Sequence, residues 1–339
     1  MNYYIGIDLH STNTYVGVID QENRKVFSKK FPNQLDTIIQ ALEPFRSAVA
    51  GVVVESTYNW YWLVDGLKEK GYRVHLANPS AIKQYEGLKH ADDVTDAFHL
   101  ANVLRLGILP EGYIYPQAER PVRDLLRKRL HLVQQRTAQI LSVQNLLTRN
   151  LALRMTAADV KKLNVWDAGQ LFTERHLILS AAASIGTIGF LGARIKELEK
   201  AVRTAGNLKR DYHLLQTVPG IGVILALTIM YETGEISRFA RVGNYVSYCR
   251  CVKSTRLSNG KSKGAGNRKN GNRHLSWAFV EAANIAVWNY GYVKSYYQRK
   301  AARTNTVVAI KAVAHKLARA CYHIISQQQA FDPKRAFAY

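Results

Sequence analysis

Four carboxylic acids stand where a folded sheet could bring them together. Asp8 stands at the end of the β-rich run YYIGIDL, and Glu55 stands at the end of the apolar run AVAGVVVES. Asp93 and Asp96 are three residues apart in DDVTDAFHLA, and this spacing puts both on one face of a helix. Each acid alone is more often a turn former or a helix N-cap. As a set, the four predict a site built from oxygen ligands.

The chemistry of such a site follows from the repulsion between its charges. Carboxylates held close together repel one another and take up protons unless a cation compensates for their charge. Ligands that are all oxygen suit Mg²⁺ or Mn²⁺. Two such ions, about 3.5–4 Å apart, can activate an attacking oxygen and stabilise the leaving oxygen of a phosphodiester. The acids therefore predict metal-dependent chemistry on a phosphodiester.

The segment from Lys253 to Arg273, KSTRLSNGKSKGAGNRKNGNR, is the second candidate for chemistry. Its 21 residues include seven Lys or Arg, four Gly, four Asn and three Ser, and no acid. This composition fits a disordered linker, a phosphate clamp or a loop that carries a nucleophilic serine. The cations that we expect to bind nucleic-acid phosphates here are Arg256, Lys261, Lys263, Arg268, Lys269 and Arg273.

The charge of the chain is both large and uneven. The 339 residues carry a formal net charge of +22, of which residues 1–110 contribute −1 and residues 111–339 contribute +23. A basic surface of that size normally meets phosphate, which favours nucleic-acid binding. The alternative is a basic soluble protein, for example one associated with ribosomes.

Several classes of protein are disfavoured by the composition. The three cysteines, Cys249, Cys251 and Cys321, have neither the number for a disulfide framework nor the spacing of a zinc site. No uninterrupted apolar run reaches the roughly 18 residues of a membrane span, and the start MNYYIGIDLH lacks the pattern of a signal peptide. We therefore expect a cytoplasmic protein with no membrane partner.

Three regions are expected to position these residues, giving an α/β plus α architecture. Residues 1–115 alternate in the order βββαβαβα, which is the order of ribonuclease H-like domains, and the first three strands fit an antiparallel meander. Adjacent strands of that fold place Asp8 beside Glu55, and the following helix lays Asp93 and Asp96 across them.

Residues 116–210 are expected to be almost wholly helical. Leu126, Val133, Ile140 and Leu147 recur every seven residues, which is heptad spacing over about three repeats. Either an intramolecular helical bundle or a coiled-coil arm that spaces domains or pairs subunits fits this pattern.

Residues 211–330 are expected to form a mostly helical third domain. Its Pro219-Gly220-Ile221-Gly222 turn is similar to that of a helix-hairpin-helix motif, in which backbone N–H groups at a helix N-terminus bind phosphate. Gly220 and Gly222 are therefore candidate nucleic-acid contacts, although a Pro-Gly-x-Gly turn alone is a weak signal.

Two sets of motifs carry a resemblance to a known family. YIGIDLHSTNTYVGVID, VVVESTYNWYWL and ADDVTDAFHLANVL resemble the Asp–Glu–Asp–Asp (DEDD) transposases of insertion-sequence family 110, in its 1111 subgroup. LLQTVPGIGVILALTI and RLSNGKSKGAGNRKNGNRHLSWAFVEAA resemble the second domain of that family. The resemblance implies a RuvC-like ribonuclease H fold that holds Mg²⁺ on Asp8, Glu55, Asp93 and Asp96. The family usually has Thr-Asp-Arg-x-Asp-Ala where this chain has DDVTDA, so Asp92 competes with Asp93, which the Asp-x-x-Asp-Ala spacing favours.

The same resemblance implies a nucleophilic serine and an RNA guide. Ser258 matches the family's serine, with Asn259 inserted before Gly260, and Ser254 and Ser262 are its neighbours. The implied reaction cuts and rejoins donor and target DNA through a covalent phosphoserine link, directed by a bridge RNA that the element encodes. It further implies a dimer or tetramer, associated with the nucleoid when active.

Two other functions remain open from the residues alone. The first is a metal-dependent nuclease, similar to a Holliday-junction resolvase, that uses no serine. The second is a scaffold that binds nucleic acid without catalysis. They differ from the first hypothesis in whether Ser258 and Asp8 are needed for DNA cleavage.

Overall fold

The structure is a computed structural model that describes residues 2–82, 93–206, 209–253, 257–264 and 270–337. The chain divides into two compact units. The N-terminal unit takes in the described residues up to Gln117, and the C-terminal unit takes in described residues from Ala118 on. The expected boundaries at residues 115 and 210 stay predictions.

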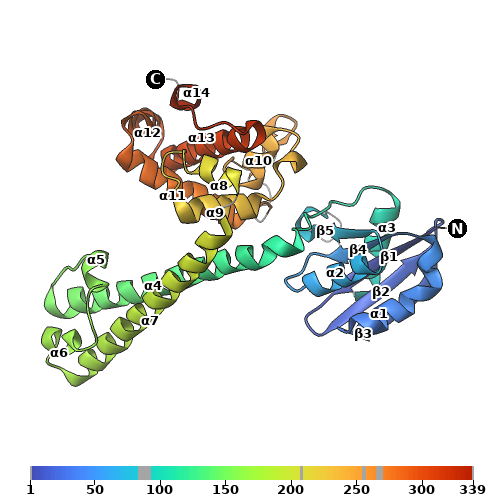
Figure 1. Cartoon of the computed structure of the whole chain (residues 1–339), viewed down its shortest axis with the longest axis horizontal. Helices are drawn as coiled ribbons and strands as arrows, with labels where there is room; N and C mark the ends of the chain where they lie inside the picture. The colour runs from blue at the N-terminus through green and yellow to red at the C-terminus, as the bar shows by residue number, and fades with distance from the viewer. Residues whose placement is uncertain (1, 83–92, 207–208, 254–256, 265–269, 338–339) are drawn as a thin grey trace. The chain divides into compact units, whose positions relative to one another are not determined.

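The N-terminal unit is built on a five-stranded sheet (Figure 1). Its strands are β1 (Tyr3–Leu9), β2 (Asn13–Ile19), β3 (Lys25–Pro32), β4 (Val49–Glu55) and β5 (Val74–Ala77). They lie in the order β3-β2-β1-β4-β5, in which β1 to β3 are antiparallel and β4 and β5 run parallel to β1. The expected order of strands and helices is confirmed, and it is consistent with a RuvC-like start.

Helices cover both faces of this sheet. They are α1 (Leu35–Leu42), α2 (Tyr61–Glu69) and α3 (Asp93–Arg105), with the 3-10 turns η1 (Glu43–Ala48) and η2 (Pro79–Ala81). Successive strand residues point to opposite faces. Ile5 and Ile7 of β1 therefore share a hydrophobic cluster with Leu42 of α1 and Leu63 of α2, whereas Gly6 between them contacts α3.

The C-terminal unit begins with a long helical hairpin. It consists of α4 (Arg120–Leu151) after the turn η4 (Gln117–Glu119), the short α5 (Ala157–Val160) and α6 (Asp167–Leu171), and α7 (Arg175–Gly206). Ile140 and Leu147 of the heptad set pack against Ile185 and Ile188 of α7 in one buried cluster. These heptad positions are therefore used within the chain, as the intramolecular alternative predicts.

Helix α7 is unusually apolar. Its residues Arg175–Ala205 are long and apolar enough on average to cross a membrane, which corrects the expectation that no segment would qualify. One such helix is weak grounds for a membrane span, because core helices of soluble proteins pass the same test. Helix α7 buries Ala181, Ile185 and Ile188 against its neighbours, and 28% of its apolar window is buried.

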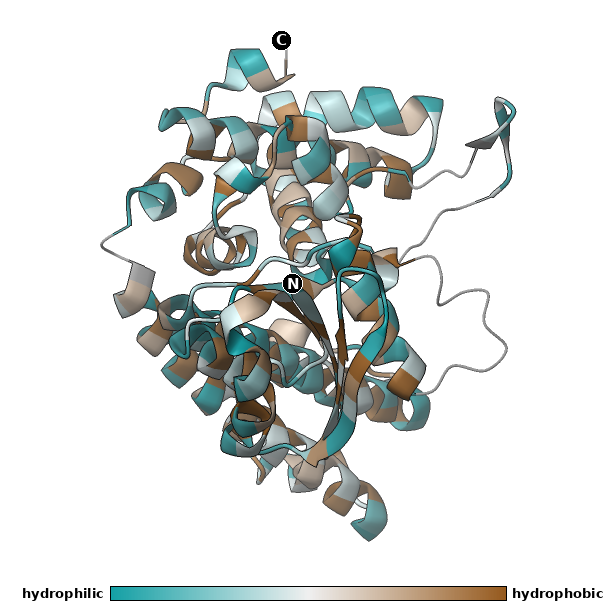
Figure 2. Ribbon diagram, turned by 90° about the vertical axis from the view of Figure 1, so that its right-hand side faces the viewer, coloured by the Kyte–Doolittle hydropathy of each residue, from teal (hydrophilic) through white to brown (hydrophobic). Residues whose placement is uncertain are grey.

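The rest of the C-terminal unit is mostly helical. Its helices are α8 (Arg210–Leu215), α9 (Val223–Thr233), η5 (Ile236–Arg238), α10 (Val242–Tyr248), α11 (Arg273–Asn289), α12 (Gly291–Arg303), α13 (Thr306–Gln327) and α14 (Pro333–Phe337). Figure 2 shows hydrophobic and hydrophilic residues following one another along these helices, as expected where a helix buries one face.

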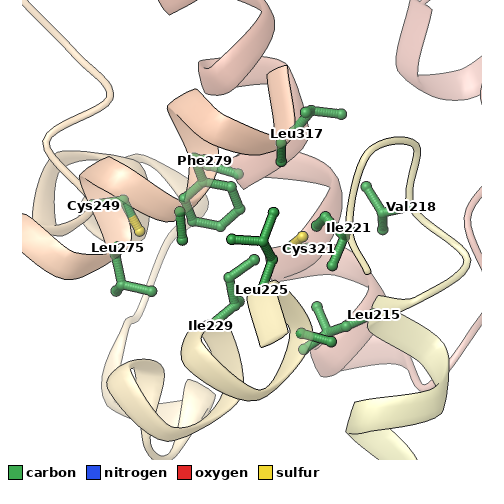
Figure 3. Packing of buried hydrophobic residues seen from close by; sticks show 14 of the residues in the cluster. Leu215, Val218, Ile221, Leu225, Ile229, Cys249, Leu275, Phe279, Leu317 and Cys321 are labelled. Carbon is green, nitrogen blue, oxygen red and sulfur yellow. The ribbon is translucent and has the colours of Figure 1, made fainter. Parts of the chain in front are cut away.

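A single apolar core joins helices α8 to α13 (Figure 3). Leu225 of α9, Phe279 of α11 and Leu317 of α13 point toward one another in this core. Cys249 and Cys321 are buried there as free thiols, and Cys251 is also buried and free. Within the described part of the chain, the cysteines therefore act as small apolar residues, in keeping with the absence of a disulfide framework.

Candidate functional site

Asp8, Glu55, Asp93 and Asp96 form an acid cluster at one end of the sheet in the N-terminal unit. Asp8 on β1 and Glu55 at the end of β4 are neighbours because these strands pair in parallel with Ile7 beside Val54. Asp8 is almost completely buried, whereas Glu55 is half-buried. The side chain of Glu55 hydrogen-bonds to Asp8, and the charge of Asp96 acts on it as well.

A glycine on β1 lets α3 come close enough to join the cluster. A Cβ atom added to Gly6 would lie 1.8 Å from the carbonyl oxygen of Ala97 on α3, a distance that no side chain can occupy. Asp93 and Asp96 stand in the first turn of this helix. The close approach therefore places both acids over the strand that carries Asp8.

The electrostatics of the cluster are dominated by its carboxyl groups. Burial, the hydrogen bond to Asp8, and the charges of Asp8 and Asp96 raise the pKa of Glu55 from 4.5 to about 8. Glu55 is therefore protonated at neutral pH when no cation is bound. A divalent cation among these oxygens would remove the repulsion and displace the proton.

His10 belongs to the cluster, although the sequence analysis did not single it out. Its Nε2 atom lies 2.9 Å from Oδ2 of Asp8 and 3.2 Å from Oδ1 of Asp93. Donor atoms of these three residues lie within 4.8 Å of one another, close enough to hold one metal ion. The signal was present in GIDLH, where the histidine follows Asp8 by two residues.

Two asparagines fix the loop that carries His10. The Nδ2 groups of Asn33 and Asn59 each donate a hydrogen bond of 3.0 Å to the carbonyl oxygen of His10. Lys30 on β3 is a further neighbour, with its Nζ atom 3.9 Å from Oδ2 of Asp93. The structure thus brings Asp93 into the cluster, while its competitor Asp92 lies outside the described residues.

Ser258 lies on a small hairpin in the C-terminal unit. Strands β6 (Leu257–Ser258) and β7 (Lys261–Ser262) are joined by Asn259 and Gly260, whose φ angles are 50° and 72°. Positive φ at both positions is the geometry of a type I′ turn, for which Asn-Gly is the preferred pair. The asparagine inserted before Gly260 is therefore the first residue of this turn.

The hairpin presents Ser258 to solvent beside a cation. Ser258 is exposed and pairs across the hairpin with Lys261, which is also exposed. Lys263 and Arg273 are exposed as well. The other expected phosphate ligands, Arg256, Arg268 and Lys269, lie outside the described residues, as does Ser254.

Comparison with known proteins assigns the chain to a family. One family model, described as "Transposase", matches residues 5–151, and another, described as "Transposase IS116/IS110/IS902 family", matches residues 212–298. This chain belongs to the IS110 family of transposases. It is therefore a DNA transposase, and the family together with the acid cluster indicates a divalent metal.

Relatives of this transposase match it along nearly the whole chain. The transposase for insertion sequence element IS1328 of Yersinia enterocolitica is 21% identical over 344 residues, covering 97% of this chain and 98% of the relative. The transposase for element IS1111A of Coxiella burnetii is 21% identical over 352 residues, covering 96% and 90%. The likeness therefore extends across both units of the transposase.

A buried ion cluster anchors the end of the basic segment in this transposase. Asn272 caps α11 by accepting hydrogen bonds from the backbone N–H groups of His274 and Leu275, at 2.8 and 3.1 Å. Its Nδ2 group donates to Oε2 of Glu232 at 2.7 Å. Glu232 is the acceptor at the centre of the cluster, and its side chain is only 1% exposed.

Two arginines of the long hairpin neutralise Glu232. Arg123 donates from Nε to Oε2 at 3.0 Å, and Arg127 donates from Nε to Oε1 at 2.5 Å and from Nη2 to Oε2 at 2.8 Å. Burial works to raise the pKa of Glu232, but the hydrogen bond from Arg127 and the charges of both arginines outweigh it and hold this pKa below its usual value. No local sequence pattern indicates this cluster, because its members are far apart along the chain.

The two glycines of the Pro-Gly-Ile-Gly turn differ in their surroundings. Gly220 is buried with φ +79°, and an added Cβ would lie 2.1 Å from the carbonyl oxygen of Ala282 on α11. This packing explains why glycine stands at position 220. Gly222 is exposed and is the N-cap residue of α9. A phosphate contact at this turn stays a prediction, and the exposure favours Gly222.

Proposed function

We propose that this transposase cuts and rejoins DNA through a covalent phosphoserine link that Ser258 forms, with the acid cluster holding Mg²⁺ or Mn²⁺. The observation that carries the metal site is the raised pKa of Glu55, since a protonated glutamate among acids indicates a place for a cation. The family assignment and the exposed hairpin support the role of Ser258.

The metal ligands of this proposal come from the acid cluster and its histidine. Asp8, His10 and Asp93 would provide one donor atom each, and Glu55 and Asp96 would complete the set. Carboxylates, with one imidazole, suit Mn²⁺ as well as Mg²⁺. When bound, such an ion polarises phosphate oxygens and stabilises charge on the leaving oxygen.

The proposed step exchanges one phosphate ester for another. The Ser258 oxygen attacks the phosphorus, a P–O bond to the DNA strand breaks, and the serine proton ends on the departing DNA hydroxyl through a base. A hydroxyl of the second DNA strand then attacks the phosphoserine and restores the serine. Each step conserves one ester bond, so that rejoining needs no ATP.

The cations of the hairpin would hold the phosphate during this exchange. Lys261 stands directly across the hairpin from Ser258, and Lys263 follows it. Arg256, Arg268, Lys269 and Arg273 are predicted to add to this grip. A positive charge beside the phosphate stabilises the charge that develops in the transition state.

The proposal also includes an RNA guide and a homo-oligomer. An element-encoded bridge RNA would pair with donor and target DNA, leaving the protein to bind backbone and shape. The excess of basic residues after residue 110 supports this division of work. Strand exchange needs more than one active site, and we therefore expect a dimer or tetramer, cytoplasmic and nucleoid-associated when active.

A covalent adduct tests this proposal. The protein, its guide RNA and a donor DNA are incubated with Mg²⁺ and resolved on a denaturing gel. We expect a protein–DNA species in the wild type that Ser258→Ala and Asp8→Asn abolish, while Ser262→Ala retains it as the matched control. An adduct that survives in Ser258→Ala contradicts the serine assignment.

The complete acid cluster within one unit also suits a metal-dependent nuclease without serine chemistry. In that case Ser258→Ala cleaves DNA as the wild type does and no adduct forms. A non-catalytic scaffold would show no cleavage by the wild type and no change in Asp8→Asn.

A further inference from the structure

A hollow is formed by residues near the C-terminal end of the chain, which in the sequence lie well after the hairpin that carries Ser258. It has a volume of about 460 Å³ and is bounded by the second half of α13, the segment that follows it, and α14. Its lining includes Lys316, Arg319, His323, Arg335 and Asp332, together with polar and apolar residues. A hollow of this volume is large enough for part of a nucleotide.

Positive side chains dominate the lining. Within the described ranges, Lys316, Arg319, His323 and Arg335 form no ion pair with an acid. Asp332 is the acid of the lining, and its Oδ1 atom accepts hydrogen bonds from the backbone N–H groups of Lys334 and Arg335, at 2.9 and 3.3 Å. These two hydrogen bonds direct the Oδ1 atom of Asp332 toward the start of α14.

These cations repel one another. Burial and then the charge of Arg319 lower the pKa of Lys316. Burial and then the charges of Arg335 and Arg319 lower the pKa of His323. Mutual repulsion of this kind is relieved when an anion enters between the positive groups.

The protein holds the walls of the hollow in place. The Nζ group of Lys316 donates to the carbonyl oxygen of Ala336 at 2.7 Å and lies over the rings of Tyr296 and Phe337. Arg335 donates from Nη1 to Oε1 of Gln327 at 3.3 Å. A ligand would therefore meet cations that are largely arranged before it binds.

The segment between α13 and α14 is anchored to α8 and the turn after it. Gln328 donates from Nε2 to Oδ1 of Asp211 at 2.6 Å, and the N–H of Phe331 donates to Oγ1 of Thr217 at 3.0 Å. These hydrogen bonds hold the segment that lines the hollow against the rest of the C-terminal unit.

We propose that this hollow binds a backbone phosphate of the DNA substrate, as a grip separate from the basic hairpin. Arginine provides planar donors that match phosphate oxygens, lysine adds positive charge, and the imidazole of His323 can donate a hydrogen bond. The usual alternative, a solvated basic helix face, fits poorly because these side chains converge on a hollow. DNA is favoured as the source of the phosphate because the chain is a DNA transposase.

The salt dependence of DNA binding tests this grip. Fluorescence anisotropy with the full chain gives the affinity for a labelled duplex over a range of NaCl concentrations. We expect the double variant Arg319→Gln, Arg335→Gln to bind more weakly and to lose about one unit of the slope of log affinity against log salt, as for one phosphate contact. Lys334→Gln, which removes one positive charge from α14 outside the hollow, is the control and should change the slope less than the double variant does.

Further arms separate the possible outcomes. Arg319→Lys with Arg335→Lys should restore most of the slope, because the charge returns, and circular dichroism checks that each variant folds. A double Gln variant with the affinity and slope of the wild type overturns the proposal. The proposal is also overturned if the double Gln variant binds DNA as the wild type does but binds an RNA of the same sequence more weakly. It is overturned likewise if that variant binds DNA normally and loses only the stabilisation that inorganic phosphate gives the wild type. The assay does not involve the serine adduct, so the two proposals can fail separately.

Discussion

Two glutamates of this transposase lie in opposite electrostatic settings. Glu55 lies among Asp8 and Asp96, and its pKa rises to about 8. Glu232 lies between Arg123 and Arg127, and its pKa falls below the usual value although burial opposes the fall. The same side chain is therefore protonated in one unit and charged in the other at neutral pH.

The difference separates a cluster whose charge the chain compensates from one that it leaves with excess negative charge. Around Glu232 the chain provides the compensating charge itself, so that the cluster is complete and holds α4, α9 and the start of α11 together. Around Glu55 the chain offers less compensation: Lys30 approaches Asp93, and the imidazole of His10 contacts Asp8 and Asp93. An acid cluster left with excess negative charge indicates a place for a metal ion.

Removing the carboxylate of Glu232 should have the largest effect on the free energy of unfolding. Glu232→Ala leaves Arg123 and Arg127 without their carboxylate, and loss of one partner of a buried ion pair costs about 3–5 kcal/mol. Urea unfolding of the full chain measures the loss. The control is Glu197→Ala, which breaks an exposed pair with Arg194 and should cost under about 1 kcal/mol. Equal costs for the two variants would show that Glu232 is not the structural centre we describe.

Displacing α3 from the sheet should weaken metal binding by the acid cluster, because α3 carries Asp93 and Asp96. Gly6→Ala places a methyl group where the carbonyl oxygen of Ala97 lies, and we expect a loss of about 1–3 kcal/mol together with weaker Mn²⁺ binding. Thermal unfolding and metal titration measure the two effects. Gly112→Ala is the control, because its Cβ would meet Leu76 at an ordinary 3.5 Å. Unchanged metal binding in Gly6→Ala would contradict this role of the close approach.

Neutralising Glu55 should stabilise the metal-free protein as the pH rises. The folded state keeps the Glu55 proton up to about pH 8 and the unfolded state loses it near pH 4.5, so wild-type stability falls across that window. Glu55→Gln avoids this fall. Because Glu55 is partly exposed, we expect a gain on the order of 1–2 kcal/mol at pH 8 in EDTA and little gain at pH 4.5. A gain that does not depend on pH would contradict the raised pKa.

Removing the imidazole should have the smallest effect of these changes. His10→Ala is expected to weaken Mn²⁺ binding about tenfold while leaving the fold intact, since a donor or its close neighbour is lost. Isothermal titration measures the affinity. His75→Ala is the control in the same unit, because His75 pairs with Glu111 and not with the cluster. Equal affinity in both variants would exclude His10 from the metal site.

The positions of the four acids could be predicted from the sequence because strand ends and helix spacing are local signals. Asp8 and Glu55 end strands that pair side by side, and the i, i+3 spacing of Asp93 and Asp96 places them on one helix face. His10 was missed because its approach to both acids depends on the loop that Asn33 and Asn59 hold.

Other features depend on contacts between distant parts of the chain. Glu232 is 105 positions from Arg127 and 109 from Arg123, so no local spacing announces their cluster. Gly220 fits a phosphate-binding turn as well as a close approach to Ala282, and only the fold shows the approach. The Asn259-Gly260 turn, by contrast, is a local signal that the sequence already contained.

Manganese titration of the wild type, Asp8→Asn and Glu232→Gln tests the contrast between the two glutamates most directly. At neutral pH, calorimetry in buffers of different ionisation enthalpy reports the metal affinity and the protons released. We predict that the wild type and Glu232→Gln bind Mn²⁺ and release a proton, which leaves Glu55, and that Asp8→Asn loses the binding. Binding that persists in Asp8→Asn, or that releases no proton in the wild type, would contradict the account.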